Sequence, residues 1–220
     1  MKISNDVKHT VIIRNESKNE YMEVERIARE AFWNIYFPGC DAHYLIHQMR
    51  KHTDFLPSYD YVATINDKLV GSIFYTKSHL ESDNGSIVKT ITFGPLSVLP
   101  EYQRIGIGSM LINKTIEQAK LDNINAIVIF GNPSNYSKFG FVGSKNYSIS
   151  NYEGKYPTSL LVKVLNENIL LNQTWKFVES SVFNIDPNKV DEYDSLFDEK
   201  TKGYDYRQEE FNILARSFVE

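Results

Sequence analysis

Cysteine is nearly missing from this chain, because Cys40 is the only one among its 220 residues. An intramolecular disulfide is therefore excluded, and we expect a protein of the reducing cytoplasm. Cys40 follows Pro38 and Gly39 without a nucleophile motif around it, so packing is favoured over catalysis. Long apolar runs are missing too. No stretch reaches the ~20 residues of a membrane span, and the first residues lack the apolar segment of a signal peptide.

A surplus of positive charge is also absent, since the formal net charge is −4. This balance argues against nucleic acid or an anionic membrane as the main partner, and it suits a cationic or amine substrate. Apolar residues make up 42% of the chain and aromatic residues 13%, which is enough for a substantial core. We expect one large domain, or one domain with an extension.

The most informative stretch runs from residue 96 to residue 112. An apolar strand ends at Pro100, a loop follows with Gly106 and Gly108, and then apolar residues recur at helical spacing. A glycine-bearing loop that leads into a helix presents backbone N–H groups to an anion. Leu111 stands where a Rossmann turn needs its third glycine, and the loop lacks the lysine of a Walker A motif.

The loop sequence Gln103-Arg-Ile-Gly-Ile-Gly108 resembles the Q/R-x-x-G-x-G/A signature of the GNAT superfamily of acyl-CoA N-acyltransferases. Further along, Tyr136-Ser-Lys-Phe-Gly-Phe141 is similar to the tyrosine segment, Y-x-x-x-G-F, of the same family. The resemblance covers residues 10–165, which we expect to form the N-acetyltransferase domain. It implies an α+β fold of mixed α/β layers, with a central, mostly antiparallel, splayed sheet flanked by helices.

The resemblance implies acetyl-CoA as the acyl donor and a primary amine of a small molecule or peptide as the acceptor, with no metal. Loop N–H groups would bind the pyrophosphate, and strand 96–98 would pair with the pantetheine arm and offer an N–H to the thioester oxygen. The residues implied to hold the cofactor are Leu96, Ser97, Val98, Gln103, Arg104, Ile105, Gly106, Ile107, Gly108, Ser109, Asn132 and Tyr136. Tyr136 is the candidate general acid, because a phenol with a pKa of about 10 is protonated at neutral pH.

The general base is not identified from the residues. Strand 87–98 offers Thr90 and Thr92 where some family members carry an acid. The remaining candidates are Glu30, Asp60, His79 and Glu81. A water chain or a backbone carbonyl is an equal alternative.

Two histidines, His43 and His47, are spaced to share one face of a helix, as metal ligands do. Tyr44 stands where the H-E-x-x-H motif carries its glutamate, so a surface or packing role is favoured.

Hydrophobic periodicity and turn residues predict the order of the elements. Strands are expected at residues 11–14, 59–65, 69–76, 87–98, 125–130, 142–149 and 156–164, and helices at 22–32, 41–49, 108–121 and 135–139. Gly94 and Pro95 lie inside strand 87–98, where the missing N–H of proline should break the pairing or form a bulge.

Residues 166–220 lie beyond the resemblance and form a C-terminal extension, with strands expected at 175–178 and 181–183 and a helix at 208–218. Residues 186–210 contain nine acidic and four basic side chains. We expect the extension either to cover the substrate cleft or to form a homodimer contact; a solvated completion of the fold is equally open. Two functions follow: an N-acetyltransferase that works by direct attack in a ternary complex, or a non-catalytic acyl-CoA-binding sensor or assembly module.

Overall fold

The computed structural model describes residues 10–170 and 173–220. Residues 1–6, which are not expected to form a signal peptide, lie outside these ranges. The strands are β1 (Val11–Asn15), β2 (Tyr61–Ile65), β3 (Lys68–Ser82), β4 (Ile87–Val98), β5 (Ala126–Phe130), β6 (Val142–Gly143), β7 (Ile149–Ser150), β8 (Leu160–Val164) and β9 (Trp175–Val178). The helices are α1 (Tyr21–Phe32), α2 (Ala42–Met49), α3 (Ile107–Leu121), α4 (Pro133–Tyr136), α5 (Pro187–Asp194) and α6 (Tyr206–Ala215).

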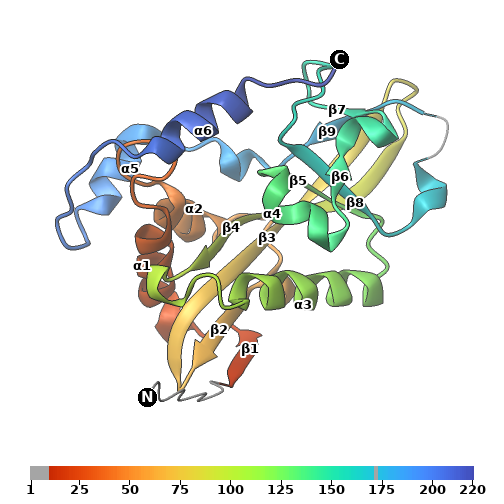
Figure 1. Ribbon diagram of the computed structural model, residues 1–220. Coiled ribbons are helices and arrows are strands. Elements are labelled where there is room, and N and C mark those ends of the chain that lie inside the picture. Colours follow the sequence, from red (N-terminus) through yellow and green to blue (C-terminus); the bar gives the residue numbers. More distant parts are fainter. Residues whose placement is uncertain (1–9, 171–172) are drawn as a thin grey trace, which may run out of the picture.

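One sheet runs through the molecule in the order β1-β2-β3-β4-β5-β8-β6 (Figure 1). Its pairs along this path are antiparallel except β4 and β5, which run parallel and are paired only at Ile91 and Ile127. Beyond that pair the two strands have no ladder between them, so the sheet splays open there. The α+β fold with a mostly antiparallel, splayed sheet is confirmed.

Helices cover both faces of the sheet. Helices α1 and α2 pack on one face and α3 packs on the other. Side chains alternate along a strand, so Phe74 joins the core under α1 and α2, whereas Tyr75 joins the core under α3. The apolar stripe of α3 explains its place, because its buried side chains recur every three to four residues. They are Ile107, Leu111, Ile112, Thr115, Ile116 and Ala119.

The predicted interruption of β4 is confirmed. The register between β3 and β4 shifts between Ile73 and Tyr75, opposite the Gly94–Pro95 peptide, which is cis. Because Pro95 has no N–H to donate, the ladder cannot continue unbroken through this point.

Two predicted strands are wrong. Residues 142–149 form the two-residue β6, a 3-10 turn at Ser144–Tyr147 and then the start of β7. The 3-10 turn interrupts the extended chain after Gly143, and Ser148 closes the turn with a left-handed φ of 54°. Residues 181–183 form a 3-10 turn, because the Ser180 hydroxyl accepts a hydrogen bond from the backbone N–H of Val182. In both places a local turn outweighs the apolar composition.

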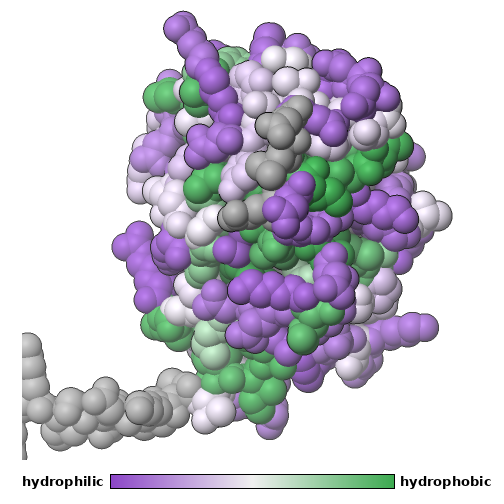
Figure 2. Space-filling view, turned by 90° about the vertical axis from the view of Figure 1, so that its right-hand side faces the viewer, coloured by the Kyte–Doolittle hydropathy of each residue, from purple (hydrophilic) through white to green (hydrophobic). Residues whose placement is uncertain are grey.

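The C-terminal segment is joined to the rest of the sheet. Strand β9 pairs antiparallel with the far half of β3 and parallel with β7. Helix α5 lies beside α2, and α6 crosses towards the end of the chain near β7 (Figure 1). The side of the molecule in Figure 2 shows apolar patches that are broken up by hydrophilic side chains. Among the described residues, no helix has both the length and the apolar character that crossing a bilayer demands.

Candidate active site

A cleft of about 590 Å³ opens where β4 parts from β5, with the amino end of α3 on one side and α4 on the other. Most of the residues predicted to bind a cofactor meet in this cleft. They are Leu96, Val98, Gln103, Arg104, Gly106, Ile107, Gly108, Ser109 and Tyr136. The splay of the sheet brings together two segments that are about thirty residues apart in the chain, the loop before α3 and the turn around α4.

Three predicted residues do not line this cleft. The side chain of Ser97 is fully buried inside the sheet, whereas Ile105 is 60% exposed outside the cleft. Asn132 lines a second cavity instead, and its carboxamide oxygen accepts the N–H of Ser134 at 3.1 Å as the cap of α4. An asparagine is a favoured residue at this capping position.

The loop before α3 has the geometry of an anion site. Arg104 and Gly106 both adopt left-handed φ values, 63° and 98°, and Gly106 is the N-cap of α3. A Cβ at Gly106 would meet nothing within 4 Å, so the space in front of the loop is open. The Gln103 carboxamide donates to the carbonyl of Val98 at 3.0 Å and ties the loop to the end of β4. Such loops hold phosphates by backbone N–H groups and the helix dipole.

Tyr136 is held firmly at the other side of the cleft. Its ring packs against Phe93 and Phe141, with centroids 5.6 and 6.0 Å away. The ring also lies directly over Gly131, where a Cβ would come within 2.4 Å of a ring carbon. Burial raises the pKa of Tyr136, with a smaller contribution from the phenol of Tyr36. The hydroxyl is therefore protonated at neutral pH and can donate a proton.

Sequence reasoning overlooked a carboxylate in this cleft. Asp41 is the N-cap residue of α2, yet its side chain makes no capping hydrogen bond and lines the cleft instead. Burial raises the pKa of Asp41, and the same carboxylate acts on the phenol of Tyr36. Lys138, two residues after Tyr136, also lines the cleft and adds a positive charge to its wall. Lys138 could have been predicted to lie in the cleft, because it belongs to the tyrosine segment 136–141. In the sequence, Asp41 is recognisable only as a helix cap, and nothing there predicts that it lines the cleft.

The predicted base candidates lie elsewhere. Glu30 pairs with Lys200 at 2.7 Å, and His79 pairs with Glu81 at 2.9 Å. Neither pair lines the cleft, nor does Asp60, which is buried. The structure thus removes all four acid–base candidates from contact with this cavity.

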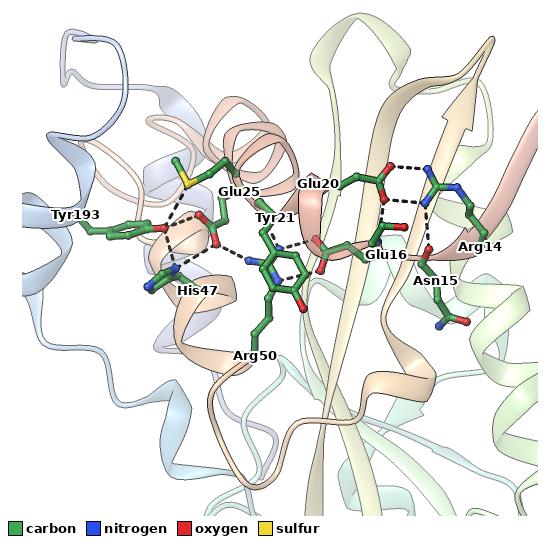
Figure 3. A network of polar contacts seen from close by, with 11 residues as sticks. Arg14, Asn15, Glu16, Glu20, Tyr21, Glu25, His47, Arg50 and Tyr193 are labelled. Carbon is green, nitrogen blue, oxygen red and sulfur yellow. Dashed lines mark hydrogen bonds and ion pairs between the residues drawn. The ribbon is translucent and has the colours of Figure 1, made fainter.

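Asp60 belongs to a buried polar cluster beside α1 and α2. Burial, together with the neighbouring Glu16, raises the pKa of Asp60 to about 8. Arg50 is held between Glu16 and Glu25, and Tyr193 of α5 donates to Glu25 at 2.5 Å (Figure 3). The cluster fastens α5 to α1 and α2, so its role is structural.

His43, His47 and Cys40 are packed against neighbouring side chains and do not line the cleft. His43 is fully buried with Asp194 at 3.2 Å, while His47 faces Tyr193 and Glu25. The described residues contain no group of three ligands that could hold a metal ion. Burial raises the pKa of the Cys40 thiol to about 12, the opposite of what a reactive thiolate needs.

A second cavity, of about 690 Å³, adjoins the first. The two share four residues along their common wall, and Tyr136 is one of them. The shared residues are Tyr36, Phe130, Asn135 and Tyr136. Tyr136 therefore stands on the wall between the first cleft and the second cavity.

A mostly antiparallel sheet that splays between β4 and β5, with a glycine loop leading into α3 at the opening, is the arrangement in which the comparisons with known proteins place this chain. The family model described as the acetyltransferase (GNAT) family matches residues 28–141, more than half of the chain. The chain belongs to the GNAT acetyltransferase family. It is 32% identical over 94 residues to the uncharacterized N-acetyltransferase YjhQ of Escherichia coli strain K12. That match covers 41% of this chain and 51% of the relative, so the chain spans about half the length of the curated relative.

Two solved structures show the same fold. The GNAT family N-acetyltransferase YhbS from Escherichia coli, in complex with CoA, has a TM-score of 0.69 and 19% identity, covering 82% of this chain and 95% of that one. A GNAT family acetyltransferase from Brucella melitensis, in complex with acetyl-CoA, has a TM-score of 0.62 and 18% identity, covering 80% and 99%.

Proposed function

We propose that this protein is an acetyl-CoA-dependent N-acetyltransferase that acetylates a primary amine by direct attack in a ternary complex. The observation that carries this proposal is the meeting of the loop before α3 and Tyr136 in one cleft. One group of residues binds an anion and the other donates a proton, and acyl transfer from a thioester needs both. The single cysteine favours the cytoplasm as the compartment.

The residues of the cleft fit acetyl-CoA, which would supply the activated acetyl group as a thioester. The open loop at Gly106 and the side chain of Lys138 would hold its phosphates. The free edge of β4 at Leu96 and Val98 would pair with its pantetheine arm, because β5 leaves this edge beyond Ile91. A backbone N–H on the same edge would stabilise the oxyanion, a contribution of roughly 3–4 kcal/mol.

Proton transfer falls to two side chains of the cleft. Tyr136 Oη supplies the proton that the departing thiolate takes up. Asp41 is the carboxylate that accepts the proton which the ammonium form of the acceptor must lose before its nitrogen attacks, because Asp41 lines the cleft without a capping bond. An alkyl ammonium group has a pKa near 10.4, so an acceptor of this kind is needed at neutral pH.

The competing function is a sensor or assembly module that binds acyl-CoA without turnover. CoA release measured with acetyl-CoA and a panel of primary amines separates the two. We expect Tyr136→Phe to lower kcat by roughly 10²–10⁴-fold with an unchanged Kd for acetyl-CoA. The control is Tyr152→Phe, which changes a 79% exposed tyrosine outside both cavities. Tight acetyl-CoA binding without turnover of any amine would favour the sensor.

A further inference from the structure

The second cavity is roofed by α6, which is fastened at both of its ends. At the amino end, the buried Gln208 donates to the carbonyls of Asn34 and Gly203 at 3.0 and 2.9 Å. At the carboxyl end, the N–H of Val219 donates to Tyr156 and the N–H of Thr158 donates to Ser217, at 2.8 and 2.9 Å. Helix α6 therefore forms a fixed strap across the cavity.

Apolar rings from three separate segments face this cavity. Tyr36 follows α1, Phe130 ends β5, Phe211 belongs to the strap, and Phe218 lies just after it. Their exposed fractions are 42%, 45%, 40% and 47%, although such rings are ordinarily covered. Tyr36 and Phe211 approach with ring centroids 4.8 Å apart, so the walls already contact one another. The four half-exposed rings give this cavity walls that suit an apolar occupant.

The charges at the cavity leave one carboxylate free. Glu153 pairs with Lys155 at 2.8 Å, and Arg207 makes two bonds to Asp205, at 2.7 and 2.6 Å. Glu210, on the inner side of the strap, takes part in none of the ion pairs among the described residues. Glu210 also acts on the nearby guanidinium of Arg207, which already has Asp205 as its partner, so this group of charges keeps a surplus of one negative charge beside the apolar walls.

We propose that this cavity is the acceptor site, and that its ligand is a primary amine carried on an aromatic or branched apolar body. The proposal rests on the proposed acetyltransferase function, because it places the acceptor across Tyr136 from the donor. The rings would bury the body of the amine, and Glu210 would attract its cationic form into the chamber. A polyamine has no apolar body to cover the rings, and an unfolded protein tail would have to displace the fastened strap.

The test compares kcat/KM for 2-phenylethylamine, spermidine and a lysine-containing peptide at saturating acetyl-CoA. We expect 2-phenylethylamine to be the best of the three by at least roughly tenfold, as apolar burial of a ring predicts. Matched variants on α6 then locate the site. Leu214 lines the cavity, whereas its neighbour Ile213 is 61% exposed and does not. Glu209 is the corresponding control for Glu210, because it is exposed outside the cavity.

Leu214→Gln should raise KM for 2-phenylethylamine roughly tenfold and Glu210→Gln roughly two- to fivefold, with KM for acetyl-CoA unchanged. Ile213→Gln and Glu209→Gln should leave both KM values unchanged. Preference for spermidine or the peptide, or equal effects of lining and control variants, would overturn the acceptor site while leaving the acetyltransferase intact. Absence of CoA release with every amine would instead contradict the proposed function. Circular dichroism of each variant shows that it is folded.

Discussion

Gly131 determines where the ring of Tyr136 can lie, and this makes Gly131→Ala a sharp test of the proposed general acid. The added Cβ would stand 2.4 Å and 2.9 Å from two carbons of the ring. Carbon atoms pack at about 3.5–4.0 Å, so the ring must retreat by about 1 Å. Phe93 and Phe141 pack on the same ring, which leaves it little room for retreat by rotation alone.

A displacement of about 1 Å in a catalytic group costs roughly 10²-fold in rate. We therefore expect kcat to fall by that factor, which corresponds to about 2.7 kcal/mol of activation free energy. The Kd for acetyl-CoA should stay within twofold, because the loop before α3 is untouched. Strain at the ring should also lower the free energy of unfolding by about 1–3 kcal/mol.

The assay is CoA release under saturating substrates, with acetyl-CoA binding measured by calorimetry. Gly143→Ala is the matched control, because a Cβ there meets nothing within 4 Å and the backbone φ is −57°. The double variant with Tyr136→Phe isolates the mechanism. If Gly131 acts through the hydroxyl alone, Gly131→Ala costs little further rate once that hydroxyl is gone. A kcat within twofold of the parent, or full additivity in the double variant, would refute the reasoning.

Three further predictions concern the loop, the base and the buried cluster. Gly108→Ala should keep or raise Tm, because its Cβ meets nothing closer than 3.9 Å and alanine favours the helix, yet it should weaken acetyl-CoA binding at least tenfold as measured by calorimetry. Asp41→Asn should lower kcat roughly 10²-fold. It should also remove the fall of kcat at acidic pH, which we attribute to protonation of Asp41 at its raised pKa. An unchanged pH profile would exclude Asp41 as the general base. Asp60→Asn should raise Tm at pH 8, by about 2–4 °C for each kcal/mol gained in the free energy of unfolding. The gain should be smaller at pH 5. An equal gain at both pH values would contradict the raised pKa of Asp60.

The sign of the Asp60 effect follows from proton linkage. The folded protein keeps a proton on Asp60 up to about pH 8, because burial beside Glu16 raises its pKa. The unfolded chain loses that proton at about pH 4. The stability that Asp60 contributes is thus fully present below pH 4 and is lost as the pH rises through this window, so the isosteric amide helps most at the alkaline end.

Local chemistry was enough to predict several parts of this molecule from its residues. The break in the pairing of β4 follows from the missing N–H of Pro95, and the loop before α3 follows from its two glycines, Gly106 and Gly108. The ends of β4 and the amphipathic stripe of α3 were also readable, because their signals lie within one element. The family motifs marked the loop before α3 and the segment of Tyr136.

Contacts between distant parts of the chain decided the remainder. Asp41 reads as an ordinary helix cap until the folded chain turns it into the cleft. The half-exposed rings of Tyr36 and Phe211 are more than 170 residues apart, and only the strap of α6 brings them to one cavity. The short-range pattern of residues 142–149 predicted one strand, which the 3-10 turn at Ser144–Tyr147 interrupts. Sequence periodicity reports which face of an element is apolar, but which faces meet depends on packing across the whole fold.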